Sequence, residues 1–109
     1  MNISVRELAT ARIVDLDGDV DLGTSPDLRR ALFDALRVTP KLALNLRSLR
    51  YIDSSGIATL IEVLKAAQRL QKDFVLFGMN PAVQNVFRLT HVNRIFRICE
   101  TEEQALSPA

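Results

Sequence analysis

Two hydroxyl groups and a carboxylate lie side by side in Asp53-Ser54-Ser55-Gly56, which follows an apolar pair and precedes a helix-patterned stretch. The backbone N–H groups of a first helical turn have no partners within the helix, and they lie at the positive end of the helix dipole. A phosphate added to a serine there would meet hydrogen-bond donors and a favourable field. The segment therefore predicts a phosphate-accepting serine that could act as a switch.

A second interpretation of the same four residues needs no chemistry. Ser54 would cap the free N–H groups of the helix, and Gly56 would let the helix lie close to a sheet. The four residues by themselves favour this plain turn, so the choice depends on the rest of the chain.

Four aspartates alternate as the early ligands of a calcium-binding loop do; they are Asp15, Asp17, Asp19 and Asp21. Such a loop needs glycine at its sixth position and a bidentate glutamate at its twelfth, where a count from Asp15 finds Val20 and Pro26. We therefore expect no metal site, and we interpret the carboxylates as solvating a strand end and its turn. The alternative is a recognition loop of Asp19 and Asp21, completed by Gly23 and Thr24, at the sheet edge where open α/β folds place their binding crevices.

The sequence lacks the residues that a hydrolase needs around its nucleophilic serine. Neither Ser54 nor Ser55 stands in a Gly-x-Ser-x-Gly context, and the single histidine, His91, falls in a predicted turn near a helix C-terminus. The glycine patterns of nucleotide-binding loops are absent as well. We expect a protein that is not an enzyme and that uses no cofactor.

Size, charge and cysteine content narrow the class of protein. The 109 residues are 48% hydrophobic, so we expect one domain over residues 1–109. The net charge of +1 favours no direct contact with nucleic acid. Cys99 is the only cysteine, and no segment approaches the roughly 18 consecutive apolar residues of a membrane span. We expect a cytoplasmic protein without membrane insertion.

Hydrophobic periodicity predicts alternating strands and helices. We expect strands over residues 3–8, 11–16, 41–46, 74–77 and 94–99, and helices over residues 26–38 and 55–71, after Asn80-Pro81 and after Thr101. Ser25, Asn80 and Thr101 are the expected N-caps. This order predicts an α/β fold with a largely parallel central sheet covered by helices.

The helix over residues 55–71 carries an apolar stripe that spans about half its circumference. Most of this stripe is expected to be core. Its edge, near Thr59, Val63 and Ala66, is expected to stay partly exposed for a protein partner. Phe33 is also expected to stay partly exposed, because it falls between two arginines on the polar side of the first helix.

Three separated patterns make the chain resemble the STAS domains of sulfate transporters and bacterial anti-sigma factor antagonists. Residues 18–22, Gly-Asp-Val-Asp-Leu, resemble the family's loop before the first helix, and residues 46–60 resemble its signature strand, turn and helix. Residues 77–83, with residues 89–90 and 95–96 beyond them, are similar to its last third. The resemblance covers nearly the whole chain.

This resemblance implies the STAS fold, a mixed, mostly parallel central sheet of four to five strands covered by about four helices. It also implies an anti-sigma factor antagonist that acts by partner switching. The unphosphorylated form would bind an anti-sigma factor that is a GHKL-type serine kinase, and so release the sigma factor. Phosphorylation of Ser54 would reverse the binding, a PP2C-type phosphatase would reset it, and Ser55 would not be the acceptor.

The expected contact surface combines the two loops with the start of the second predicted helix. Its residues are Asp19, Asp21, Thr24, Asp53, Ser54, Ser55, Gly56, Thr59 and Val63. A phosphoserine carries about −1.5 to −2 charges, so it would repel these carboxylates if the loops converge. It would spoil a surface matched to a neutral serine without any large refolding.

The resemblance fits a second role, that of a STAS subunit that binds the ATPase of a bacterial phospholipid ABC transporter. Residues 57–64 resemble both groups, and Ser54 or Ser55 would then supply an interface hydroxyl without phosphorylation. Arg47, Arg50 and Arg88 are interpreted as solvated surface residues, with docking to the kinase or the ATPase as the alternative.

Overall fold

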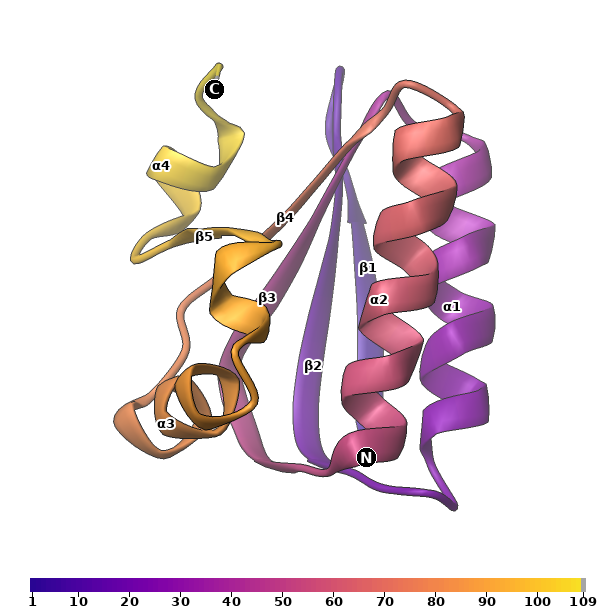
Figure 1. Cartoon of the computed structure of the whole chain (residues 1–109). Coiled ribbons are helices and arrows are strands. Elements are labelled where there is room, and N and C mark those ends of the chain that lie inside the picture. Colours follow the sequence, from indigo (N-terminus) through magenta and orange to yellow (C-terminus); the bar gives the residue numbers. More distant parts are fainter. Residues whose placement is uncertain (109) are drawn as a thin grey trace.

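The computed structural model describes residues 1–108 of the chain, and Figure 1 shows how its elements are arranged. Within these residues the strands are β1 (Asn2–Glu7), β2 (Arg12–Val20), β3 (Lys41–Ile52), β4 (Asp73–Phe77) and β5 (Arg97–Cys99). The helices are α1 (Ser25–Arg37), α2 (Ser54–Arg69), α3 (Pro81–Leu89) and α4 (Glu102–Leu106), with a short 3-10 helix, η1 (Val92–Arg94). The order of strands and helices is the predicted one.

The strands form one sheet in the order β1-β2-β3-β4-β5. β1 pairs antiparallel with β2, and every later pair is parallel. Parallel neighbours need a crossover connection, which α1, α2 and the α3–η1 segment supply in turn. The predicted mixed, mostly parallel sheet is confirmed.

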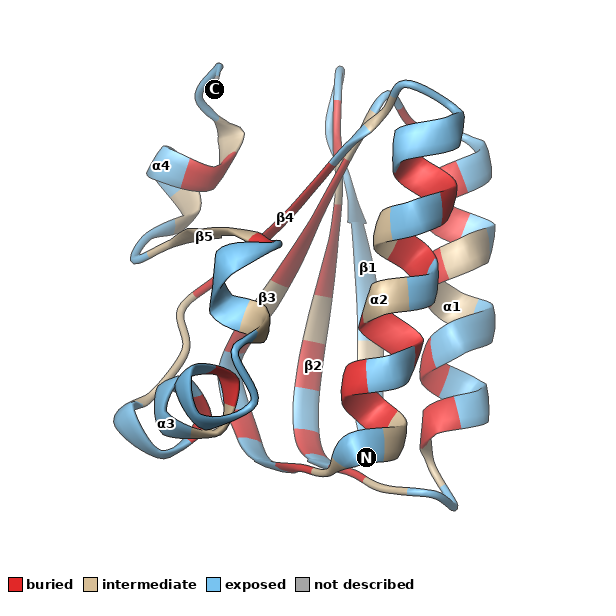
Figure 2. Ribbon diagram, in the orientation of Figure 1, coloured by how far each residue is buried: buried red, intermediate tan, exposed pale blue. Residues whose placement is uncertain are grey.

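The two faces of the sheet are covered unequally, as Figures 1 and 2 show. The main core lies between one face and helices α1, α2 and α3, where strand residues such as Leu44 pack with Leu32, Leu60 and Phe87. On the other face the small helix α4 covers a second cluster, which consists of Ile13, Ala43, Val75, Phe77 and Ala105. Alternate residues of one strand therefore enter different cores.

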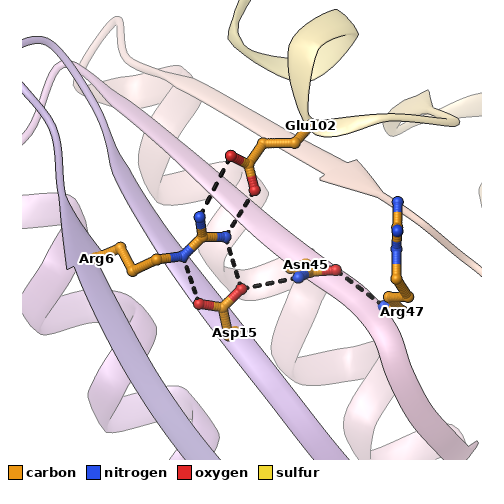
Figure 3. A network of polar contacts seen from close by, with 5 residues as sticks. All are labelled: Arg6, Asp15, Asn45, Arg47 and Glu102. Carbon is orange, nitrogen blue, oxygen red and sulfur yellow. Dashed lines mark hydrogen bonds and ion pairs between the residues drawn. The ribbon is translucent and has the colours of Figure 1, made fainter.

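Polar side chains occupy the part of this second face beside α4 (Figure 3). The Arg6 guanidinium donates to both oxygens of Asp15, at 2.6 and 2.8 Å, and to Glu102 of α4 at 2.7 Å. Asn45 donates to the same Asp15 carboxylate at 2.8 Å. Hydrogen bonds from Arg6 hold the pKa of Asp15 below its usual range. Asp15 thus links β1, β2, β3 and, through Arg6, α4, instead of solvating a strand end as predicted.

β2 and β3 are longer than predicted, because the alternation that marks a strand is broken before each strand ends. β2 continues past residue 16 to Val20 through two irregularities in its pairing with β3, between Asp15 and Asp17 and between Gly18 and Asp19. Gly18 has a φ of 110°, which few residues with a side chain adopt. β3 continues beyond residue 46 to Ile52 alongside it.

The helix starts agree with the prediction at two of three places. Asn80 accepts a hydrogen bond from the Val83 N–H at 2.9 Å, and Thr101 forms the expected capping box with Gln104. The prediction for Ser25 is wrong, because Thr24 holds the N-cap position of α1 and Ser25 is its first, buried residue. Near the other end of the chain, β5 begins only at Arg97, because residues 92–94 form η1.

Candidate functional site

The two loops that the sequence singles out meet where β2 and β3 end. Asp19 lies beside Tyr51 and Val20 beside Ile52 in the parallel pairing of these strands. The Asp53 N–H then donates to the Val20 carbonyl at 3.2 Å. The loop after β2 and the start of α2 therefore converge, as the proposed repulsion between their charges requires.

Asp53, not Ser54, caps α2. Its Oδ1 atom accepts hydrogen bonds from the N–H groups of Ser55 and Gly56, at 2.9 and 3.3 Å, and from the Ser55 hydroxyl at 2.5 Å. The bond from the Ser55 side chain, with the backbone bonds, lowers the pKa of Asp53. At neutral pH the helix start therefore already carries a negative charge that uses two of its free donors.

The two serines differ in what their hydroxyl groups do. The Ser55 hydroxyl is half-buried and engaged with Asp53. Ser54 is exposed as the first residue of α2, and its hydroxyl makes no hydrogen bond to any residue between 1 and 108. Of the two, Ser54 is the hydroxyl that another molecule can reach and modify without breaking an internal bond.

Gly56 fixes the position of this helix start against the sheet. A Cβ atom built on Gly56 would lie 2.6 Å from Cγ1 of Ile52 and 2.8 Å from Cγ1 of Val20. Real Cβ contacts are essentially never this short. A larger residue would force either the helix or these two side chains to shift, which agrees with the close approach expected at this position.

The loop after β2 is organised around Asp21 and Thr24. One Asp21 carboxylate oxygen accepts the N–H groups of Gly23 and Thr24, at 2.9 and 3.1 Å. The Thr24 hydroxyl accepts from the Asp21 N–H at 2.9 Å and donates to the Asp19 carbonyl at 3.0 Å. Asp21 therefore shapes its own loop, whereas the half-exposed Asp19 carboxylate faces Arg50 at 3.6 Å.

Two exposed apolar side chains near this loop were not among the predicted contact residues. Leu22 is 78% exposed at the tip of the loop, and Tyr51 is 53% exposed near the end of β3. The sequence did contain a signal for Leu22, because a single leucine between an aspartate and a glycine in a predicted loop is expected to be exposed. Together with Ser54 and Asp19, these side chains give the strand ends a mixed polar and apolar surface suited to a protein partner.

The expectation that one edge of α2 stays exposed is wrong. Thr59, Val63 and Ala66 are only 5%, 0% and 4% exposed. α1 lies alongside α2 in Figure 1, and Arg29 of α1 pairs with Glu62 of α2 at 2.9 Å. The apolar stripe of α2 is wide because the helix packs against both the sheet and α1, so Thr59 and Val63 present no free surface.

Phe33 is partly exposed, as predicted. It packs partly against the main core, and the Arg29 guanidinium lies 4.8 Å from the centre of its ring. The polar side of α1 therefore holds Phe33 under an arginine, an arrangement that stabilises both side chains.

The site holds neither a metal cluster nor an activated nucleophile among the described residues. No group of three or more His, Cys, Asp or Glu side chains in residues 1–108 is arranged to bind a metal ion. His91 is exposed in the turn after α3 and shares no hydrogen bond with either serine. Nor does any helix in this part of the chain have the length and apolar character to cross a membrane. What the arrangement can do is present a free hydroxyl beside a fixed negative charge.

Comparison with known proteins gives one consistent result. The family model described as STAS domain matches residues 2–105. The anti-sigma-B factor antagonist of Listeria monocytogenes is 29% identical over 107 residues, which cover 94% of this chain and 93% of that protein.

Solved structures share the fold. A crystal structure of an anti-sigma factor antagonist from Mycobacterium paratuberculosis superposes with a TM-score of 0.88 at 22% identity, and the match covers 96% of this chain and 90% of that one. The Bacillus cell fate determinant SpoIIAA in its phosphorylated form gives a TM-score of 0.71 at 19% identity, with 96% of each chain covered. Both identities are low, so these two structures are similar in fold.

Proposed function

Because the chain belongs to the STAS domain family, we propose that it is a single-domain anti-sigma factor antagonist that works by partner switching in the cytoplasm. In its unphosphorylated form it binds a GHKL-type serine kinase that is the anti-sigma factor, and the sigma factor is released. Phosphorylation of Ser54 ends this binding, and a PP2C-type phosphatase restores it. The chain itself carries out no catalysis and contacts no nucleic acid.

The observation that carries this proposal is the contrast between the two serine hydroxyls at the start of α2. Ser54 is exposed and makes no hydrogen bond within residues 1–108, while the Ser55 hydroxyl is bound to Asp53 at 2.5 Å. A kinase would modify the free hydroxyl, because the other must first give up a charge-assisted bond. Relatives named anti-sigma-B factor antagonists support the choice of partner.

The charge of the helix start explains how a phosphate would end binding. A phosphoserine at position 54 adds about −1.5 to −2 charges next to Asp53, whose carboxylate already accepts the Ser55 and Gly56 N–H groups. The helix terminus therefore has fewer free donors left to neutralise the phosphate. An interface matched to a neutral serine would have to desolvate this charge, which costs several kcal/mol.

Binding to the purified anti-sigma kinase of the native bacterium, measured by calorimetry with wild type and three variants, tests the proposal. Ser54→Ala keeps the surface neutral, so we expect affinity within about threefold of wild type and no incorporation of phosphate at residue 54 by mass spectrometry. Ser54→Asp places a charge in the interface and is expected to weaken binding at least about 30-fold. Ser55→Ala is the matched control and should still accept phosphate at Ser54.

Equal affinities of Ser54→Ala and Ser54→Asp would contradict the switch. Affinity isolation from the native bacterium provides a second check on the partner. Recovery of an ABC transporter ATPase together with its permease, and of no anti-sigma kinase, would favour the transporter-subunit role instead.

A further inference from the structure

Residues 74–99 contain no aspartate or glutamate, although they include three arginines and a histidine. One of the arginines has an internal role, since Arg97 donates to the carbonyl oxygens of Gln104 and Ser107 at 3.0 and 3.1 Å. The other two, Arg88 and Arg94, are exposed and form no ion pair with any residue from 1 to 108. This part of the molecule therefore presents cations that no carboxylate of the described chain neutralises.

A tight turn packs the two elements that carry these arginines, α3 and η1, against each other. α3 ends at Leu89, His91 takes a left-handed conformation with a φ of 62°, and η1 follows at once. The turn places Arg88 of α3 and Asn93 of η1 on the wall of the same hollow, which has a volume of about 470 Å³. An Asn85 side-chain oxygen accepts a hydrogen bond from the Arg88 guanidinium and so orients it.

Apolar side chains accompany the cations. Leu89, the last residue of α3, is 65% exposed, and Ile95, the first residue after η1, is 49% exposed. Met79, Phe87 and Ile98 are the apolar side chains that line the hollow, together with Pro81. We call the set of exposed residues, Arg88, Leu89, His91, Arg94 and Ile95, the α3–η1 surface.

The α3–η1 surface lies at the same end of the sheet as Ser54. α3 follows the carboxyl end of β4, and Asn80 at its start donates to the Leu49 carbonyl of β3 at 2.8 Å. Leu49 precedes Asp53 by only four residues. Figure 1 shows α3 and the start of α2 at this common end.

We infer that the α3–η1 surface binds an acidic segment of the anti-sigma factor, with its carboxylates facing Arg88 and Arg94 and an apolar side chain in the adjoining hollow. The inference rests on the proposed function, because the same partner occupies the start of α2. It adds a second contact of opposite charge, which leaves the effect of Ser54 intact while setting how tightly and how fast the partner docks. A protein segment fits better than an anionic membrane, because amide groups of Gln84, Asn85 and Asn93 line the hollow and would be desolvated by acyl chains.

Charge reversal provides the test. The Arg88→Glu/Arg94→Glu double variant is compared with Arg30→Glu/Lys65→Glu, which changes the net charge equally at exposed residues of α1 and α2 that form no ion pair among the described residues. Binding to the anti-sigma kinase is measured by calorimetry at about 0.05 M and 0.3 M salt, after thermal unfolding has shown that both variants fold. We expect the first variant to bind about 10- to 100-fold more weakly at low salt and to lose most of the salt dependence that wild type shows.

Each further outcome decides between the two proposals. If the kinase binds wild type but not Ser54→Asp, and Arg88→Glu/Arg94→Glu binds like the control, the inference is wrong and the proposed function stands. If the kinase does not bind wild type, both are wrong. Vesicles of phosphatidylcholine with phosphatidylglycerol test the membrane alternative. If wild type binds the vesicles, Arg88→Glu/Arg94→Glu does not, and the affinity for the kinase is unchanged, the surface binds a membrane and the inference is wrong.

The apolar part of the surface is tested separately. Leu89→Ala/Ile95→Ala should weaken binding several-fold at both salt concentrations, because it removes apolar contact and no charge. Leu70→Ala, at another exposed leucine, is the control and should have no effect. Unchanged affinity of the first variant would remove the apolar contact from the inference.

Discussion

Two helices of this molecule begin with a serine, and the two serines have opposite environments. Ser25 is the first residue of α1 and is 6% exposed, whereas Ser54 is the first residue of α2 and is exposed. Each follows the carboxyl end of a strand, β2 or β3, and these two ends lie side by side. A serine at a helix start is therefore not by itself a site that a kinase can reach.

The position of each serine in its helix explains the difference. Ser25 precedes Leu28 and Leu32 by three and seven residues, so it continues the buried stripe of α1. Ser54 precedes the exposed residues Ala58 and Glu62 by four and eight, so it continues the solvent side of α2. The buried stripe of α2 begins two residues later, at Gly56. The position of the serine relative to the buried stripe of its helix therefore decides whether a kinase can reach it.

The largest effect is expected from placing the same charge at both serines. Ser25→Asp puts a carboxylate at a buried position and should lower the free energy of unfolding by about 2–4 kcal/mol. Ser54→Asp puts it in solvent at a helix start, where we expect a change of less than about 0.5 kcal/mol. Urea denaturation of both variants measures the two values, and similar losses would mean that the two starts do not differ as described.

A smaller effect is expected from the two glycines near these helix starts. Gly56→Ala forces a Cβ atom against Ile52 and Val20 and should cost about 1–3 kcal/mol of stability. Gly23→Ala is the matched control in the loop before α1, where the nearest atom to a new Cβ is an Asp21 oxygen at 3.4 Å. Denaturation midpoints compare the pair; a Gly56→Ala protein as stable as Gly23→Ala would show that α2 can shift away from the sheet.

The smallest effect concerns the pH dependence of the two caps. α2 is capped by the Asp53 carboxylate, whose pKa is lowered in the folded protein, whereas Thr24 at the start of α1 does not titrate. Folding therefore favours charged Asp53, and this contribution is present above the unfolded pKa of about 3.9 and is lost as the pH falls through the folded pKa. Asp53→Asn keeps a capping oxygen without a charge.

We expect the stability advantage of wild type over Asp53→Asn to be constant from neutral pH down to about pH 5 and to shrink below about pH 4. Titration of Asp15 affects both proteins equally and cancels in the difference. Chemical denaturation at a series of pH values gives the comparison, and an advantage that grows toward low pH would contradict the depressed pKa.

Local rules predicted much of the fold. Proline at the first helical turn, polar caps and hydrophobic periodicity located the helices, and short apolar runs located the strands. The ends of β2 and β3 were missed because Gly18 and the irregular pairing break the alternation that identifies a strand. Continued pairing with a neighbouring strand keeps these residues extended, and a single-strand pattern carries no information on pairing.

The positions of the candidate site residues were predicted where these residues are local in sequence. Asp53, Ser54, Ser55 and Gly56 lie at the start of α2 as expected, although the capping role belongs to Asp53. Thr59 and Val63 were placed on a free edge because periodicity does not say which neighbour covers a helix. Arg6 and Glu102 are 96 residues apart, so the contact by which Arg6 joins Asp15 to α4 had no signal in the sequence.

The acid-free segment described above also means that charge is unevenly distributed along a chain whose net charge is only +1. Asp19, Asp21 and Asp53 lie where β2 and β3 end, whereas Arg88 and Arg94 belong to α3 and η1. A partner with the complementary charge distribution would be rotated toward the productive orientation before contact, which raises the encounter rate at low salt. Phosphate at Ser54 would add negative charge beside Asp53, so it would change the long-range field that the partner meets as well as the short-range fit.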